Sequence, residues 1–164
     1  CIGCDDELHF IWECDTMVSS TGIAGLVTSV ERKSRFVRLR RVKSRKARPV
    51  TCALLAKLMP LVGLVRSLTF DRGSEFAEYT LIEHALGAKT YFADPHCAWQ
   101  RGTNENTNGL LRQYFPRDRC MSTLTDAEVD RIERKLNNRP RKALGFRTPS
   151  EVLLGTQQRG ALQS

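Results

Sequence analysis

Three acidic residues stand out because of the sequence that surrounds each of them. Glu105 lies in RGTNENTNGLLRQYF, and no other acid occurs between Asp94 and Asp118. Asp71 directly follows the apolar stretch LTF, which reads as the carboxyl end of a strand, where open sheets usually place their sites. Asp15 lies in IWECDTMV, a run apolar enough for a central strand, where an acid needs a partner or a metal. We therefore predict that Asp15, Asp71 and Glu105 form one site.

These side chains offer oxygen donors only, and that donor set favours Mg²⁺, with Mn²⁺ as a substitute. Magnesium keeps several waters in proteins and takes one or two carboxylates. Two such ions about 4 Å apart activate an attacking oxygen and stabilise a leaving oxygen in phosphoryl transfer. No histidine or cysteine is spaced to compete for the ions. We expect the three carboxyl groups to lie roughly 4 to 8 Å apart.

Two of the acids also have an ordinary structural explanation. Glu105 would balance Arg101 and Arg112, which lie one and two turns away on a helix. Asp71 would be a turn residue or the first residue of a helix. The sequence leaves both explanations open beside metal binding.

The helix that carries Glu105 is expected to present one polar stripe. At 100° per residue, Arg101, Glu105, Asn108 and Arg112 fall within about 60° of one another. We assign the arginines and Asn108 of this stripe to phosphate contacts. Trp99 lies in the loop before the helix, where it either positions a strand at the site together with Arg101 or caps the core.

The elements that must position these residues follow from the apolar periodicity and the turn signals. Strands are predicted over 11–18, 22–30, 35–42, 67–70 and 89–94. Helices are predicted over 49–59, 74–86, the segment around Glu105 and 125–136, and a short final helix begins at Thr148. A meander of three strands followed by alternating helices and strands indicates an α/β fold with a mixed sheet flanked by helices.

A basic segment begins before the third predicted strand, runs through it and continues beyond it, with basic side chains that reach outward from the strand. Twelve lysines and arginines and no acid occur between Arg32 and Ser67, in a chain of net charge +8. Such a surface favours binding to a phosphate backbone, and a merely solvated face is the alternative. The residues assigned to this contact are Arg38, Arg40, Lys43, Arg45 and Lys46.

The ends of the chain and its six cysteines are less informative. Cys1 and Cys4 form a CxxC that is either half of a zinc site or a pair of incidental thiols, and we favour the thiols. Residues 1–10 match no pattern, residue 1 suggests a start inside a longer product, and the polar tail 155–164 is expected to fray. No apolar run approaches the ~20 residues that cross a bilayer, so we expect a soluble intracellular protein.

Taken in order, several stretches resemble the catalytic core of bacterial transposases of the insertion-sequence-thirty family, within the DDE transposase and retroviral integrase superfamily. They are WECDT, VERKSRF, LTFDRGSEF, YFADPHCAWQRGTNENTNGLLRQYFP and LNNRPRKALGFRTPSEVL, within residues 11–154. The family's catalytic aspartates fall on Asp15 and Asp71 and its glutamate on Glu105, with the 33 residues between the last two that are typical of the family. The resemblance implies a ribonuclease H-like fold with a five-stranded mixed sheet.

The resemblance also implies a function. It is DNA cleavage at transposon ends and transfer of the 3′-OH to target DNA, by a homo-oligomer assembled on DNA in the bacterial cytoplasm and nucleoid. Two alternatives share the fold: a decayed or repurposed DNA-binding module, and a ribonuclease H-type nuclease, which the motif from Tyr91 to Pro116 disfavours. The family usually has glycine at Cys14, asparagine at Arg72 and other residues at His96 and Cys97, and we expect these departures to crowd the site while sparing the acids.

Overall fold

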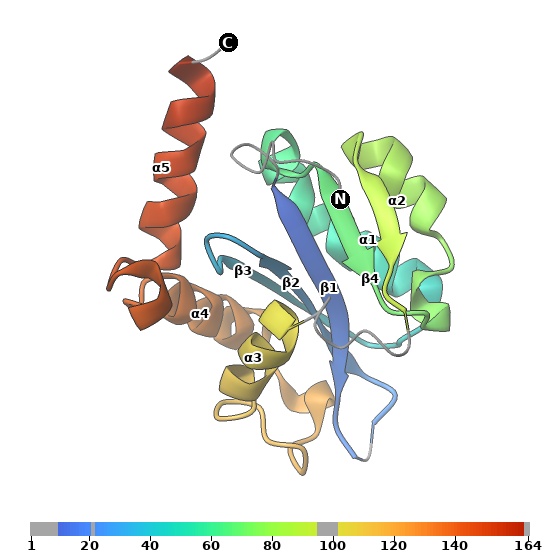
Figure 1. The fold of residues 1–164 in the computed structure, drawn as a ribbon. Helices are drawn as coiled ribbons and strands as arrows, with labels where there is room; N and C mark the ends of the chain where they lie inside the picture. Colours follow the sequence, from blue (N-terminus) through green and yellow to red (C-terminus); the bar gives the residue numbers. More distant parts are fainter. Residues whose placement is uncertain (1–9, 21, 95–101, 163–164) are drawn as a thin grey trace.

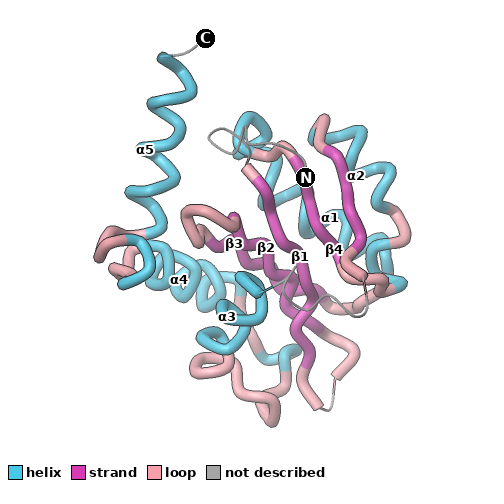
Figure 2. The backbone as a smooth tube through the Cα atoms, in the orientation of Figure 1, coloured by secondary structure: helices cyan, strands magenta, loops and turns pink. Residues whose placement is uncertain are grey.

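The computed structural model describes residues 10–20, 22–94 and 102–162. They form a five-stranded sheet in the order β3-β2-β1-β4-β5, with helices on both faces (Figures 1 and 2). The strands are β1 (Ile11–Val18), β2 (Gly25–Glu31), β3 (Val37–Val42), β4 (Ser67–Phe70) and β5 (Lys89–Phe92). All five coincide with strands predicted from the sequence, and the mixed α/β architecture is confirmed.

The sheet is antiparallel on one side of β1 and parallel on the other. β1, β2 and β3 pair as an antiparallel meander, whereas β4 and β5 pair parallel to β1 and to each other. Every residue of β2 is buried, as expected for a strand with helices on both faces. β4 and β5 are each reached through a helical crossover, which parallel pairing requires.

Two groups of helices cover the two faces. One core joins the sheet to α1 (Ala47–Leu58), η2 (Ser74–Phe76) and α2 (Tyr79–Leu86) around the buried Trp12 and Phe70. The other joins it to α3 (Gly102–Leu111), η4 (Met121–Thr123) and α4 (Asp126–Asn137) around Leu26 and Leu39. Figure 1 shows α3 and α4 together on one side of the sheet. Because side chains alternate along a strand, consecutive residues of β1 belong to different cores.

Side chains from α4 close the outer edge of β3. The amide of Asn137 accepts from the Val37 N–H and donates to the Val37 carbonyl, both at 2.8 Å. A carboxylate oxygen of Glu133 accepts from the Leu39 N–H at 2.6 Å. These bonds occupy backbone groups that an edge strand would otherwise offer to another chain.

The helix boundaries differ from the predicted ones in three places. α1 begins at Ala47 and continues as η1 (Met59–Leu64), because Pro60 lies in the first turn of η1, where its missing N–H costs nothing. The helix predicted over 74–86 is two pieces, η2 and α2. After η5 (Lys142–Leu144), α5 (Pro149–Leu162) extends further than the sequence predicted.

The segment Ala47–Leu64 is both long and apolar. Its mean hydropathy of 1.4 over 18 residues passes the length and composition test for a membrane-spanning helix. In the structure Val50, Ala53, Leu54 and Leu58 of this segment are buried in the core against the sheet. We therefore interpret it as a core helix.

Candidate functional site

Asp15 and Asp71 lie level with each other at one end of the sheet. β1 and β4 are parallel, and their register pairs Glu13 with Thr69. The same register, continued by two residues, sets Asp71 beside Asp15. Because neighbouring strands lie about 4.8 Å apart, the topology brings these two aspartates to adjacent positions.

Both aspartates belong to the face of the sheet that α3 and α4 cover. Their neighbours Cys14 and Phe70 are buried in the core on the α1 side. Since successive side chains point to opposite faces, Asp15 and Asp71 project to the α3 side. Both are half-buried, so solvent reaches this end of the sheet.

α3 lies along β1 and contacts it at three successive levels. The Asn104 backbone N–H donates to Glu13 Oε2 at 2.8 Å, and Asn108 Nδ2 donates to Asp15 Oδ2 at 3.0 Å. Arg112 Nη2 donates to the Val18 carbonyl at 3.1 Å. Asn104 and Asn108 lie on α3 and Arg112 directly follows it, and their spacing of four residues lets one side of this segment supply all three contacts.

Glu105 lies on the exposed side of α3, next to this contact row. It is three residues before Asn108, which binds Asp15, and residues at that spacing are neighbours on a helix surface. Within residues 10–20, 22–94 and 102–162, no three acidic, histidine or cysteine side chains are close enough to hold one metal ion. The structure therefore gathers the acids at one end of the sheet without grouping all three, and their role as metal ligands stays a prediction.

Glu13 is an acid of this region that sequence reasoning missed. It is only 1% exposed, and Arg32 Nε lies 3.1 Å from its Oε1. Burial raises the pKa of Glu13, while the Asn104 N–H and the Arg32 charge act in the opposite direction. Glu13 thus anchors the first turn of α3. The sequence did contain a signal for Glu13, because an acid inside the apolar run IWEC requires partners.

Asp71 begins a tight turn. Its Oδ1 accepts from the Gly73 N–H at 3.0 Å, so the turn role that the sequence left open is present. A Cβ at residue 73 would collide with the Glu75 carboxylate and lie 2.9 Å from Asp71 Oδ1. Gly73 has a φ of −68°, which any residue adopts, so only the space beside these two carboxylates favours glycine here.

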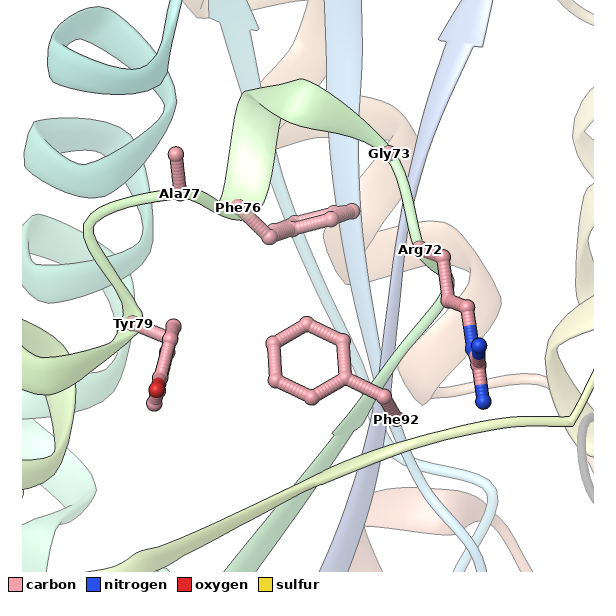
Figure 3. A pocket seen from close by; sticks show the side chains of 6 residues that line it. All are labelled: Arg72, Gly73, Phe76, Ala77, Tyr79 and Phe92. Atoms are coloured by element: carbon pink, nitrogen blue, oxygen red, sulfur yellow. The ribbon is translucent and has the colours of Figure 1, made fainter.

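An aromatic hollow adjoins the turn (Figure 3). It has a volume of about 390 Å³ and is lined by Arg72, Gly73, Phe76, Ala77, Tyr79 and Phe92. The rings of Tyr79 and Phe92 meet edge to face, with centroids 5.1 Å apart. Arg72 lies at the rim, where Nη2 is 3.2 Å from Asp94 Oδ1.

Cys14 and Arg72, which depart from the family pattern, are next to Asp15 and Asp71 in the sequence but do not crowd the acids. Cys14 is buried in the core of the α1 face, with its Sγ 3.4 Å from Ser29 Oγ, on the side of β1 away from Asp15. The Arg72 side chain lines the aromatic hollow and pairs with Asp94. The expectation that Cys14 and Arg72 crowd the site is therefore wrong. His96 and Cys97 lie outside the described residues.

The residues assigned to phosphate contacts differ in how firmly they are held. Arg38 is engaged: its Nη1 lies 2.8 Å from Glu133 Oε1, and its Nε donates to the Lys57 carbonyl. Arg40 is half-buried, and Lys43, Arg45 and Lys46 are exposed. Trp99 and Arg101, like the CxxC at Cys1 and Cys4, lie outside the described residues.

Arg112 stands close to Asp15. Burial lowers the pKa of Arg112, the Arg117 charge adds to that effect, and the Asp15 charge opposes it. Within the described part of the chain, Arg112 Nη1 and Asn108 Oδ1 are buried without a hydrogen-bond partner. A donor and an acceptor of this kind are suited to a polar ligand that enters beside Asp15.

The sequence is similar to transposases. It is 46% identical over 143 residues to transposase InsI of insertion sequence element IS30C from Escherichia coli K12, across 87% of this chain and 37% of that protein. It is 40% identical over 139 residues to the transposase of insertion sequence element IS4351 from Bacteroides fragilis, across 85% of this chain and 43% of that protein. The chain thus spans about two fifths of the length of these relatives. No protein-family model matches it.

The fold is similar to solved integrase cores. The catalytic core domain of BIV integrase superposes with a TM-score of 0.68 at 18% identity, covering 93% of this chain and 98% of that one. A simian T-cell lymphotropic virus intasome chain superposes with a TM-score of 0.68 at 20% identity, covering 89% of this chain and 54% of that one. These similarities confirm the predicted ribonuclease H-like fold.

Proposed function

The chain belongs to the IS30 family of transposases, and from this membership we propose that it is the catalytic core that cleaves DNA at transposon ends and joins the freed 3′-OH to target DNA. The observation that supports the proposal best is the register of β1 and β4, which sets Asp15 and Asp71 level on one face of the sheet. α3 carries Glu105 on its exposed side, three residues before Asn108, which binds Asp15.

The donor chemistry of this end suits a divalent cation. Asp15, Asp71 and Glu105 would hold Mg²⁺ or Mn²⁺, since carboxylates are the hard oxygen donors that these ions prefer. When bound, the ion supplies Lewis acidity that lowers the pKa of a water and stabilises charge on a leaving oxygen.

The protein's own groups hold the acids in place. The Thr16 N–H donates to Asp15 Oδ1 at 2.8 Å, and Asn108 fixes the other oxygen, so the Asp15 carboxylate is oriented by two elements. Glu13 fixes the first turn of α3 on β1 and therefore sets the height of Glu105 along the strand. Oriented carboxylates need less rearrangement when the reacting phosphate arrives.

Two in-line displacements at phosphorus account for the reaction. In the first, a water oxygen bonds to phosphorus, the P–O3′ bond breaks, and the departing O3′ takes up a proton. In the second, that 3′-OH loses its proton and attacks a target phosphorus, whose own P–O3′ bond breaks. Because both steps pass through a similar transition state, one set of carboxylates serves both, with no covalent protein intermediate.

DNA is the proposed partner, and the exposed Lys43, Arg45 and Lys46 together with Arg40 are the cations placed to meet it. Arg38 is less available because Glu133 already pairs with it. Asn108 and Arg112 would meet the strand beside Asp15. We further propose that the protein works as a homo-oligomer on DNA in the bacterial cytoplasm, in keeping with its transposase relatives.

A strand-transfer assay on a pre-cleaved transposon end tests the proposal, with the intact protein and Mg²⁺ or Mn²⁺. Joined product that requires the metal supports a transposase core. Firm DNA binding with neither nicking nor joining would support the repurposed binding module, an alternative that stays open because the three acids do not form one group among the described residues. Cleavage restricted to RNA in hybrids would support the ribonuclease H-type nuclease instead.

A further inference from the structure

The face of the sheet that carries Asp15 and Asp71 is apolar on one half and polar on the other. On the β1–β3 half its residues are apolar and are buried beneath α3, η4 and α4. They are Met17, Leu26, Val30, Val37 and Leu39. On the β4–β5 half the same face carries Ser67, Thr69, Lys89 and Tyr91. A face of this composition is suited to a polar partner, because an apolar helix packed on it would leave its polar groups without hydrogen bonds.

These polar residues lead toward Asp71. Ser67 pairs with Lys89 and Thr69 pairs with Tyr91 across the parallel strands. Asp71 is the next residue of the same face after Thr69, about 6.6 Å further along the strand direction. The polar strip therefore begins beside the carboxylates and runs away from them toward the amino ends of β4 and β5.

A cleft of about 770 Å³ lies along this strip. The described residues that line it are Ile11, Arg32, Arg66, Ser67, Thr69, Gly87, Lys89 and Tyr91, and none of them is acidic. Arg66 and Lys89 are exposed, and Arg32 is held at the margin by Glu13. Tyr91 is 54% exposed. A cleft with cations along it and an open aromatic ring is complementary to an anionic chain that carries planar groups.

We propose that this cleft, the β4–β5 cleft, binds an unpaired DNA strand that continues from the carboxylate end of the sheet. This inference rests on the proposed function. Arg66 and Lys89 contact successive phosphates, and one base stacks on Tyr91. Two observations favour a single strand over a duplex. Tyr91 can stack only on a base that has left its own stack, and the strip is two short strands wide.

Metal-free binding of a fluorescent oligothymidylate to the intact protein, followed by anisotropy across a salt series, tests the proposal. Tyr91→Ala should weaken binding of the single strand about 5- to 150-fold, the equivalent of ~1–3 kcal/mol for one stacked base. It should leave duplex binding unchanged. Arg66→Ala with Lys89→Ala should reduce the log–log salt slope by about 1.4, because each phosphate of a single strand that the protein neutralises contributes roughly 0.7.

Arg131→Ala with Arg134→Ala is the matched control, because both arginines are exposed on α4, away from the β4–β5 cleft. Equal effects of the cleft and control pairs would overturn the proposal. The proposal would also be overturned if Tyr91→Ala weakened the binding of single strand and duplex equally. A third contrary result would be that poly-glutamate displaces the oligothymidylate from the wild type but not from the variant with Arg66→Ala and Lys89→Ala. Because no metal is added, the binding result does not depend on DNA nicking. A failure of catalysis is detected separately, in the strand-transfer assay. Melting temperatures of all variants should match the wild type, because every substituted side chain is largely exposed.

Discussion

Two regions of the molecule use carboxylates in opposite ways. At the seam between β3 and α4, Glu133 is 5% exposed and binds a strand N–H, Arg38 and Lys57 at once. At the carboxyl end of β4, Asp71 and the neighbouring Asp15 of β1 are half-buried, and Glu105 of α3 is exposed. A buried carboxylate is tolerated only when cations and N–H donors surround it. The seam acid is thus committed to the fold, whereas the acids at the strand ends keep access to solvent and to ligands.

The contrast also separates the two effects that a substitution can have. Removing Glu133 from the seam leaves Arg38 partly desolvated without its carboxylate partner and leaves Lys57 with Asp130 alone, which is a cost in stability. Replacing Asp71 by asparagine keeps an acceptor for the Gly73 N–H, so the cost of that substitution should appear in activity. Four experiments test this separation.

The largest expected effect is that of Asp71→Asn. It should reduce metal-dependent nicking and joining by about 1,000-fold or more, because a bound ion supplies several kcal/mol of transition-state stabilisation. The amide can still accept from the Gly73 N–H, so the melting temperature and DNA affinity should stay near wild type. Asp94→Asn is the control, an exposed acid near the same end that pairs with Arg72. A loss of folding in step with activity would make Asp71 structural and remove the contrast.

The seam should respond in the opposite way. Glu133→Ala should lower the free energy of unfolding by about 3–5 kcal/mol, the usual result of removing one partner from a buried ion pair. Activity per folded molecule should be retained. Urea denaturation measures the first quantity, and Arg131→Ala on the same helix should change it by less than about 0.5 kcal/mol. A change below about 1 kcal/mol for Glu133→Ala would show that the seam does not depend on this acid.

A third substitution acts between the regions, on the side chain that positions Asp15. Asn108→Ala removes the 3.0 Å hydrogen bond to Asp15 Oδ2. Residues that orient a metal ligand are typically worth about 10- to 100-fold in metal affinity or activity, so we expect a loss of that size, partly recovered at high Mn²⁺. Asn106→Ala, an exposed asparagine of the same helix, should be neutral. If Mn²⁺ dependence did not move while activity fell, Asn108 would act on DNA and not through Asp15.

Local sequence patterns predicted all five strands, and they placed Asp71 directly after a strand and Asp15 inside one. The apolar stretch IWECDTMV forms β1, which contains Asp15, and the apolar run before Asp71 forms β4. The α-helix does end before Pro60, as predicted, but the chain continues as η1, because proline also fits the first turn of a helix.

The contacts of α3 could not be predicted from the sequence. Helical periodicity placed Glu105 and Asn108 on one polar stripe. Which of them meets β1 depends on how the helix is rotated on the sheet, and the buried Glu13 bonded to the Asn104 N–H fixes that rotation. The same holds for Arg38: a basic run predicts cations on a surface, whereas its pairing with Glu133 depends on α4, which lies far along the chain.

The smallest expected effect concerns the exposed basic residues that follow β3. The comparison here is between these cations and Arg38, the cation that pairs with Glu133 at the seam. Neutralising Lys43, Arg45 and Lys46, which are exposed, should lower the log–log salt slope for duplex binding by about 0.9 for each phosphate that the protein no longer neutralises. Affinity should fall similarly on unrelated duplexes, because phosphate contacts do not read sequence. Arg38→Ala should instead reduce stability and leave the slope unchanged, since its guanidinium is already bound to Glu133 and to the Lys57 carbonyl. A slope that moved for Arg38→Ala and not for the exposed residues would show that the seam, and not the exposed segment, meets the DNA backbone.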